Sequence, residues 1–466
     1  MSAATAHTRE FSSLIAARLD RLPMTPTLWR LVTLISLGGA FELYELFLTG
    51  YIAPGLVSSG IFANANVGFF GLNGLGFFVF SNFAGMWVGC TFLGSIADRF
   101  GRRAIFVWAL VWYSVCSAIM AFQNTAGGID LWRFMAGIGV GLEQVTIDAY
   151  IPEFVPPKSR GKAFAYYQFV EFCIVPVVAL LGWLLVPRQI LGLDGWRWVT
   201  LIGSLGALIA WWLRRGLPES PRWLAVHGRE AEADLVMQKI EAGVERDLGK
   251  PLPPAGPPLP VEEGASNFAE IFKPPYGRRT LVMSVFNLMQ TIGFYGFNSW
   301  VPTLLMTQGI NLATSLQWAF IIAIANPVGP LLGMLVADRM ERKWQIVSAG
   351  IGIGGFMYLF ARQTDFTWII LFGVLVTLSN NWMSFALHNY QGELFPTRIR
   401  SRAVGFVYGW SRVSAGFAGL LIGFFLQRAG VPGVAAFIGA AMFVMIITIG
   451  GFGPRTRHLA LEEIAR

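Results

Sequence analysis

The chain has 466 residues, of which 55% are hydrophobic and only 13% are charged. A soluble domain carries roughly 25% charged residues, because its surface faces water, so a soluble globule of this size is excluded. The apolar residues form long blocks, and a block of about 18 or more residues is long enough to cross a bilayer as a helix. Because period-two alternation is absent, the pattern predicts an all-α membrane protein.

Residues 1–29 form a charged segment at the N-terminus. It carries Arg9, Arg18 and Arg21 and lacks a small-residue cleavage pattern, so a signal peptide is not expected. The apolar residues between Phe11 and Leu22 fit a short amphipathic helix that lies on the membrane surface.

Apolar runs, divided by Gly, Pro and charged residues, predict twelve transmembrane helices in two six-helix, pseudo-symmetric halves. The spans are expected near residues 30–57, 72–97, 104–122, 129–151, 163–186, 197–213, 280–306, 314–337, 344–361, 367–390, 403–426 and 432–452. A polar stretch with a proline-rich segment and one helical patch near 229–248 separates the halves. The predicted units are the N-terminal segment 1–29, the first half 30–213, the cytoplasmic linker 214–279, the second half 280–452 and the cytoplasmic tail 453–466.

The formal net charge is +8, and its placement indicates topology instead of nucleic-acid binding. With the N-terminus inside the cell, nearly all Lys and Arg residues fall on the inner side, as is typical of membrane proteins. The exceptions are Arg188, Arg197, Arg362 and Arg428 on the outer side and Arg133 and Arg412 within spans. We therefore expect a multi-pass protein of the inner (plasma) membrane, with both termini cytoplasmic and no nucleic-acid partner.

A loop motif occurs once in each half. Gly94-Ser-Ile-Ala-Asp98-Arg99-Phe-Gly101-Arg102-Arg103 follows span two, and Gly333-Met-Leu-Val-Ala-Asp338-Arg339-Met-Glu341-Arg342-Lys343 follows span eight. A weaker echo follows spans four and ten. Acid–base pairs of this kind can latch two halves together and break as they rock, although basic residues that merely anchor the loops are an alternative. The predicted gating residues are Asp98, Arg99, Arg102, Arg103, Glu153, Arg160, Glu219, Arg222, Asp338, Arg339, Arg342, Glu393 and Arg400.

The Gly-x3-Asp-Arg-x-Gly-Arg-Arg block resembles the signature of the major facilitator superfamily, and the resemblance covers essentially the whole chain. Three further segments resemble its sugar-porter and organic-ion-transporter branches: Arg133–Gly141, Pro218–Leu224 and Gly392–Arg400. The second half departs from the pattern because Glu341 stands where the first half has Gly101. The resemblance implies a secondary transporter with its substrate site between the halves, near the bilayer midplane.

Span one carries two acids, Glu42 and Glu45, on one helix face. Two carboxylates this close and out of water are expected to titrate as a coupled pair, which suits a proton-coupling site. Structural carboxylates that bond neighbouring helices are the alternative. The family resemblance makes Arg133 of span four the counter-ion, with a snorkelling anchor as its alternative.

Arg412 lies near the middle of span eleven, where a guanidinium requires an anionic or carbonyl partner. Its segment resembles that of organic anion transporters, which implies that Arg412 binds a substrate carboxylate. A permanent salt bridge to Glu171 or Glu42 is the alternative. Further predicted substrate-binding residues are Gln290, Asn287, Tyr295, Asn298, Glu171, Asn381 and Trp382.

Glycines 137, 139 and 141 predict a close-packing helix surface, not a phosphate loop, because they lie inside an apolar helix.

Together these patterns favour a proton-coupled symporter of a small organic acid, such as an aromatic carboxylate resembling nicotinate or benzoate, that works by alternating access. A sugar or polyol symporter is the alternative, and a transporter-like metabolite sensor is an alternative of another class. Because a metal-ligand cluster, a nucleophile with its base and a nucleotide loop are absent from the sequence, no enzyme activity, cofactor or metal is expected. The expected partners are the substrate, protons and the lipid bilayer, and the protein is expected to be monomeric.

Overall fold

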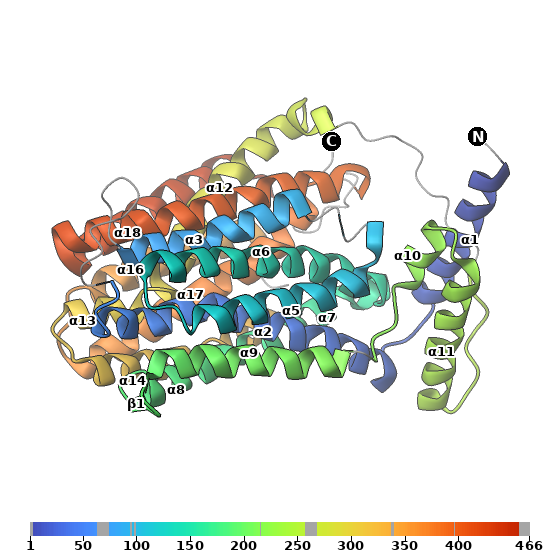
Figure 1. Ribbon diagram of the computed structural model, residues 1–466. Coiled ribbons are helices and arrows are strands. Elements are labelled where there is room, and N and C mark those ends of the chain that lie inside the picture. The colour runs from blue at the N-terminus through green and yellow to red at the C-terminus, as the bar shows by residue number, and fades with distance from the viewer. Residues whose placement is uncertain are drawn as a thin grey trace.

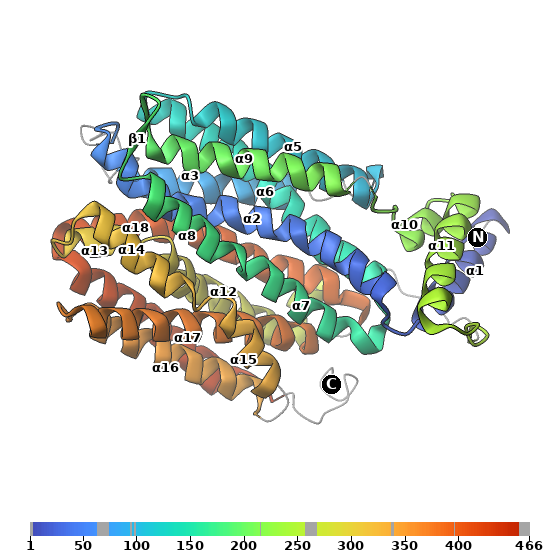
Figure 2. The same ribbon diagram turned by 90° about the horizontal axis from the view of Figure 1, so that it is seen from below.

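The computed structural model describes residues 3–62, 74–93, 96, 99–214, 216–256, 268–336, 340–395 and 397–455. Long helices lie side by side in one elongated bundle, with a small group of helices at one end (Figure 1). Figure 2 shows the helices of the first half along one side of the bundle and those of the second half along the other.

Helices cover all six spans expected for the first half. They are α2 (Pro26–Ser58), α3 (Gly74–Val88) with a π-helical turn (Gly89–Leu93), α5 (Arg102–Met120), α6 (Ala126–Tyr150), α7 (Arg160–Phe172) with α8 (Ile174–Leu185), and α9 (Gly195–Arg214). Short 3-10 turns at Ile151–Glu153 and Pro157–Ser159 join α6 to α7. A hairpin of β1 (Gln189–Ile190) and β2 (Leu193–Asp194), which the sequence pattern does not predict, joins α8 to α9.

The second half repeats this arrangement. A 3-10 turn (Phe268–Phe272) precedes α12 (Tyr276–Asn298) with α13 (Val301–Thr307), α14 (Leu312–Ala323) with α15 (Val328–Val336), α16 (Arg342–Phe360), α17 (Phe366–Glu393) and α18 (Thr397–Ile447), which ends in a π-helical turn (Thr448–Phe452). Gly430, with φ of 63°, and Pro432 interrupt α18, so this one helix supplies the two expected spans eleven and twelve. Proline also marks a break elsewhere: Pro302 lies in the first turn of α13, a position where its missing N–H costs little.

Seven helical segments in the described part of the chain are long and apolar enough, by length and composition alone, to cross a membrane. One of them, Ala403–Phe452, has 50 residues and therefore suffices for two crossings. Helix α6 does not meet this criterion, and it carries the buried charged residues Arg133 and Glu143. Charged groups buried within a membrane-spanning helix cost free energy, and they commonly mark functional positions.

Helices α3 and α6 pack along the glycine surface predicted from the sequence. A Cβ atom at Gly137 would overlap the backbone oxygen of Asn82, and one at Gly141 would overlap that of Met86. Gly85 of α3 is equally close to the backbone of Phe134. The predicted close-packing surface is therefore confirmed. Across the interface between the halves, α3 packs on α18 and α8 packs on α14.

The group of helices at the end of the bundle consists of α1 (Ala3–Asp20), α10 (Pro221–Val226) and α11 (Glu230–Leu248), here called the cap (Figure 1). The helices predicted near the N-terminus and near 229–248 are confirmed. The membrane-surface position expected for the first of them is wrong, because Ile15, Leu19 and Leu22 are buried in a cluster with side chains of α10 and α11. The apolar face fits protein as well as lipid, and the linker helices provide the protein surface.

Candidate functional site

A cavity of about 110 Å³ lies between the two halves. Helices α2, α6 and α7 line it from the first half, and α12, α17 and α18 line it from the second. Its polar lining consists of Gln144, Tyr167, Gln168, Glu171, Gln290, Tyr295, Ser384, His388, Tyr408, Ser411 and Arg412. Its position at the interface of the halves is the one expected for the substrate site.

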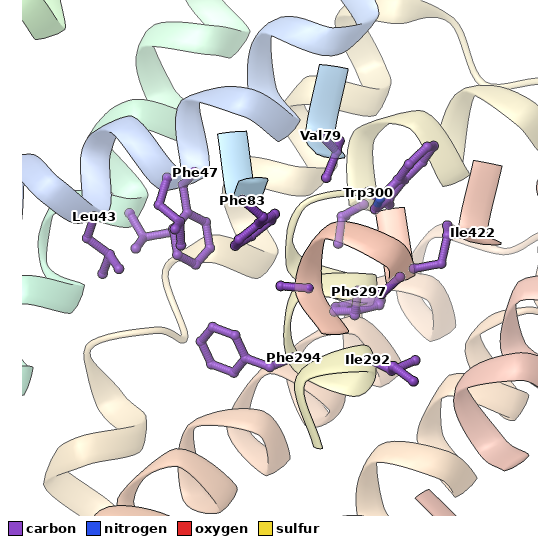
Figure 3. Packing of buried hydrophobic residues seen from close by; sticks show 14 of the residues in the cluster. Leu43, Phe47, Val79, Phe83, Ile292, Phe294, Phe297, Trp300 and Ile422 are labelled. Carbon is purple, nitrogen blue, oxygen red and sulfur yellow. The ribbon is translucent and has the colours of Figure 1, made fainter. Parts of the chain in front are cut away.

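Aromatic side chains form the apolar part of this region. The ring of Phe83 lies 4.7 Å from that of Tyr295, centroid to centroid, and the ring of Phe294 lies 5.0 Å from it. Phe172 and Phe294 line the cavity from opposite halves. Figure 3 shows Phe83 and Phe294 together with Leu43 and neighbouring apolar side chains from separate helices. Such walls fit a flat ligand with a large apolar surface.

Arg412 of α18 is 98% buried at the edge of this cavity, since only 2% of the residue is exposed. Its Nη1 donates to the Tyr295 hydroxyl at 2.9 Å, and its Nη2 donates to the Tyr408 hydroxyl at 3.1 Å and to Gln144 Oε1. The guanidinium also lies over the Tyr408 ring, 5.0 Å from its centroid. Its Nε is buried and has no hydrogen-bond partner in the described part of the chain.

The hydrogen-bond partners described for Arg412 are therefore two hydroxyls and one amide oxygen, and all of them are neutral. A buried charge without an opposite charge is costly, and hydrogen bonds to neutral groups offset only part of that cost. The cavity thus has a positive group whose described hydrogen-bond partners are neutral, and the acid Glu171 lies in the same lining. The permanent salt bridge weighed from the sequence is not among the bonds described for Arg412.

A second buried charge network lies inside the first half. Arg133 Nη1 donates to Glu45 Oε2 at 2.8 Å, and the side chains of these two residues are 0% and 2% exposed. Ser117 Oγ donates to the same carboxylate oxygen at 2.9 Å, while Arg133 Nη2 donates to Thr49 Oγ1 at 2.6 Å and to the Glu45 backbone oxygen. The predicted pair of Glu45 and Arg133 is thus formed, and the complete burial of Arg133 excludes a snorkelling anchor.

Glu42 and Glu171 face a different environment from Glu45. Glu42 is 1% exposed and Glu171 lines the cavity. Both act electrostatically on the Tyr295 hydroxyl that accepts a hydrogen bond from Arg412. Glu42 is therefore close to the cavity, and its titration as a coupled pair with Glu45 stays a prediction.

Of the other predicted substrate ligands, Gln290 lines the cavity, as does Tyr295. Four others do not belong to the lining of this cavity. Asn287 donates to Met283 O at 2.9 Å in its own helix, Asn381 donates to Asn326 O at 3.0 Å, Trp382 donates to Gln345 O at 3.0 Å, and Asn298 is buried in α12. Substrate binding by these four residues stays a prediction.

Several predicted gating residues of the first half and the linker lie near the cap. Arg102 Nε lies 3.3 Å from Glu153 Oε1. The carboxylate of Glu219 accepts hydrogen bonds from the backbone N–H groups of Arg102 and Arg103, and so caps the N-terminus of α5. Gly101 has φ of 103°, and a Cβ there would press on this carboxylate. Burial raises the pKa of Glu153, while hydrogen bonds from Ser220 and Arg102 oppose the shift.

The remaining predicted gating residues form other contacts or lie outside the described part of the chain. Arg222 pairs with Asp20 of α1 at 2.7 Å, and Arg160 Nη2 donates to Pro152 O at 3.4 Å. Arg99 is exposed, and Arg342 begins α16. Asp98, Asp338, Arg339 and the side chains of Glu393 and Arg400 lie outside the described residues. The described ion pairs stay within the first half and the cap, so a latch between the halves stays a prediction.

Four residues of these networks are not predicted from the sequence: Ser117, Thr49, Gln144 and Tyr408. Tyr408 precedes Arg412 by one helical turn, and this spacing is a signal that could have found it. Gln144 and Ser117 lie far from their partners in the chain. Only the approach of separate helices reveals their roles.

A family model described as sugar (and other) transporter matches residues 31–466. The chain belongs to this family. The transporter is 30% identical to the inner membrane metabolite transport protein YdjE of Escherichia coli, over 97% of the transporter and 98% of YdjE. It is 25% identical to the niacin transporter NiaP of Acinetobacter baylyi, over 97% and 99% of the two chains, and 24% identical to the benzoate transport protein of that organism, over 88% and 86%.

The fold has a counterpart among solved structures. The xylose transporter XylE of E. coli, in a partially occluded inward-open conformation, matches with a TM-score of 0.74 at 20% identity, over 93% of the transporter and 99% of XylE. The transporter therefore has the all-helical major facilitator fold. It is a multi-pass membrane protein and a secondary transporter of metabolites, not an enzyme.

Proposed function

We propose that the transporter is a proton-coupled symporter of a small organic acid, with an aromatic monocarboxylate as its substrate. The observation that carries this proposal is Arg412, a buried guanidinium at the edge of the cavity whose described hydrogen-bond partners are neutral. A carboxylate would pair well with this group, because a guanidinium matches it with two parallel hydrogen bonds.

The cavity walls support the aromatic part of the proposal. Phe172, Phe294 and Tyr295 would contact an apolar ring while Arg412 holds the carboxylate. The names of the niacin and benzoate transport proteins specify ligands of this shape, an aromatic ring with one carboxyl group. A lining of aromatic rings with a few polar groups fits such a ligand better than a fully polar one.

Proton coupling is assigned to Glu45. When a proton binds to its carboxylate, Glu45 loses its charge and its ion pair with Arg133, and Arg133 keeps its hydrogen bond to Thr49. Because a buried ion pair and its broken form differ by several kcal/mol, this protonation would favour a different arrangement of α2, α5 and α6. The charges of Glu42 and Glu171 would change the electrostatic potential in the cavity.

The distribution of Lys and Arg supports a location of the transporter in the inner membrane with both termini in the cytoplasm. The cap then lies on the cytoplasmic side together with Arg102, Glu153 and Glu219. A monomer contains the whole cavity, and so a single chain suffices for the cycle.

The experiment measures uptake of labelled benzoate, nicotinate and xylose into proteoliposomes with an inwardly directed proton gradient. We expect gradient-dependent accumulation of a carboxylate by the wild-type protein and its loss in Arg412→Gln. The matched control is Arg428→Gln, which removes an exposed arginine of the same helix. Carboxylate uptake by Arg412→Gln at the wild-type rate contradicts the proposal.

A sugar symporter is the second candidate. Gln168 and Gln290 place two amide groups in the lining, and amides suit sugar hydroxyls. In the same assay, xylose accumulation without carboxylate accumulation would favour this function.

A further inference from the structure

Gln144 and Arg412 connect the two halves at the cavity. Gln144 belongs to α6 in the first half and Arg412 to α18 in the second. The amide oxygen Oε1 of Gln144 accepts a hydrogen bond from Nη2 of Arg412, and both residues line the cavity. The other two described partners of Arg412, Tyr295 and Tyr408, belong to its own half.

Gln144 thus provides the bond to Arg412 that crosses from one half to the other. The Gln144 oxygen is a neutral acceptor, whereas the Arg412 guanidinium is charged. A hydrogen bond between a guanidinium and a carboxylate is stronger and shorter than one between a guanidinium and a neutral amide. A carboxylate could take the Nη2 hydrogen now given to Gln144 with one oxygen, and the unpartnered Nε with the other. These two nitrogens form one edge of the planar guanidinium, so the two bonds would be parallel.

We propose that Gln144 is a stand-in ligand, which occupies Arg412 while the cavity is empty and is displaced by the carboxylate of the substrate. This inference rests on the proposed function. It assigns Gln144 a positioning role that acts through Arg412.

The exchange has a consequence for the transport cycle. Each time the carrier passes through a closed state, Arg412 is shut off from water and needs an acceptor. The substrate completes the set of acceptors in the loaded carrier, and Gln144 completes it in the empty one, beside the hydroxyls of Tyr295 and Tyr408. Gln144 therefore permits the empty carrier to reorient. Net symport requires this step. Counterflow, the exchange of labelled for unlabelled substrate, does not require it.

Two substitutions separate these roles. Gln144→Leu keeps a similar volume but removes one of the three described acceptors, so in the empty closed state a buried N–H of Arg412 has no acceptor while the bonds to Tyr295 and Tyr408 remain. Leaving such a group unsatisfied costs enough to slow net uptake about tenfold or more, while counterflow stays within about twofold of wild type. Gln144→Glu places a competing carboxylate at Arg412, so binding of benzoate and nicotinate weakens about tenfold or more and both transport modes fall.

The experiment compares net uptake and counterflow of benzoate and nicotinate in proteoliposomes and measures their binding to the purified variants. Gln168→Leu is the matched control, because it removes another amide of the same cavity that makes none of the described bonds to Arg412; its ratio of counterflow to net uptake is expected to equal that of wild type. In an Arg412→Gln background, Gln144→Glu should not weaken the binding of benzoate and nicotinate any further. Size-exclusion profiles show that each variant is folded, and for Gln144→Leu the retained counterflow shows it as well.

The outcomes are distinguishable. If wild type binds neither carboxylate, the proposed function fails and this inference fails with it. If wild type transports a carboxylate but Gln144→Leu lowers net uptake no more than counterflow, or Gln144→Glu binds as wild type does, the inference alone is overturned.

Discussion

Two buried arginines are stabilised in different ways. Arg133 has a carboxylate partner, Glu45, within the same half. Arg412 has hydroxyl and amide partners at the interface between halves. A carboxylate that already has a partner can respond to a proton, whereas a guanidinium with neutral partners can respond to an anion. This difference underlies the assignment of the proton to Glu45 and of the substrate to Arg412.

Replacement of Glu45 by Gln should separate exchange from accumulation. Gln keeps the length of the side chain and its hydrogen-bonding capacity, but it fixes the uncharged state, so the site can no longer load and release a proton. We expect gradient-driven accumulation of the substrate to disappear while counterflow persists. Loss of a partner from a buried pair destabilises a protein by about 3–5 kcal/mol, so a lower melting temperature is expected as well.

Glu232→Gln is the control for this substitution, because Glu232 lies on the surface of α11 and pairs with Arg229 of the cap. It should accumulate substrate as wild type does. Accumulation by Glu45→Gln at the wild-type level would show that another group carries the proton.

At the scale of elements, the contact of α3 with α6 depends on the absence of side chains. Gly137 faces the backbone of Asn82, so even one methyl group would force the helices apart. Overpacking of a tight interior costs about 1–3 kcal/mol. We expect Gly137→Ala to lower the melting temperature in detergent and to reduce the yield of monodisperse protein. Gly127→Ala is the matched control, because a Cβ at Gly127 would meet no atom within 4 Å; equal melting temperatures of the two variants would contradict the packing argument.

The docking of α1 in the cap depends on charge. Arg18 binds Glu241 at 2.5 Å and Asp234 at 2.6 Å, and Arg21 binds Glu241 at 2.5 Å. Burial works to raise the pKa of Glu241, but the hydrogen bonds from Arg18 and Arg21 outweigh it, so the pKa is lowered. An acid with a lowered pKa stabilises the folded state above its unfolded pKa, about 4.3, and this stabilisation is lost as the pH falls through the lower, folded value.

Amide hydrogen exchange in α1 should therefore be slow at pH 7 and, after correction for intrinsic rates, become faster below about pH 4. Glu241→Gln should give fast exchange in α1 already at pH 7, because the charge-assisted bonds from Arg18 and Arg21 are lost. Glu232→Gln should leave α1 protected. Protection of α1 that is the same in Glu241→Gln and wild type would show that the apolar contacts of Ile15 and Leu19 suffice.

At the scale of the whole molecule, the sequence predicts what is local or periodic. Twelve apolar runs predict the spans, and the spacing of Gly137 and Gly141 predicts a packing surface. The position of α1 could not be predicted, because its apolar face fits lipid or protein equally well. The contact of Gln144 with Arg412 joins residues that are far apart in the chain and on different helices, and no local pattern encodes such an approach. The break after Phe172, inside one apolar run, is invisible to hydropathy, but Pro176 marks it, because a proline has no N–H to donate to the Phe172 carbonyl.

The last prediction concerns the charge moved by the complete carrier. A monocarboxylate that enters with one proton carries no net charge, so only the pH gradient drives the coupled step. One pH unit is worth about 1.4 kcal/mol, or tenfold accumulation. A membrane potential of 100 mV would add about 2.3 kcal/mol for each net charge moved, so a neutral sugar entering with one proton would respond strongly to it. In proteoliposomes with a potassium gradient and valinomycin, carboxylate accumulation should follow the pH difference and stay the same when the potential is imposed or removed. Accumulation that rises with an inside-negative potential would mean that more than one proton accompanies the carboxylate or that the cargo is neutral. In the second case Arg412 would bind an acceptor other than a carboxylate.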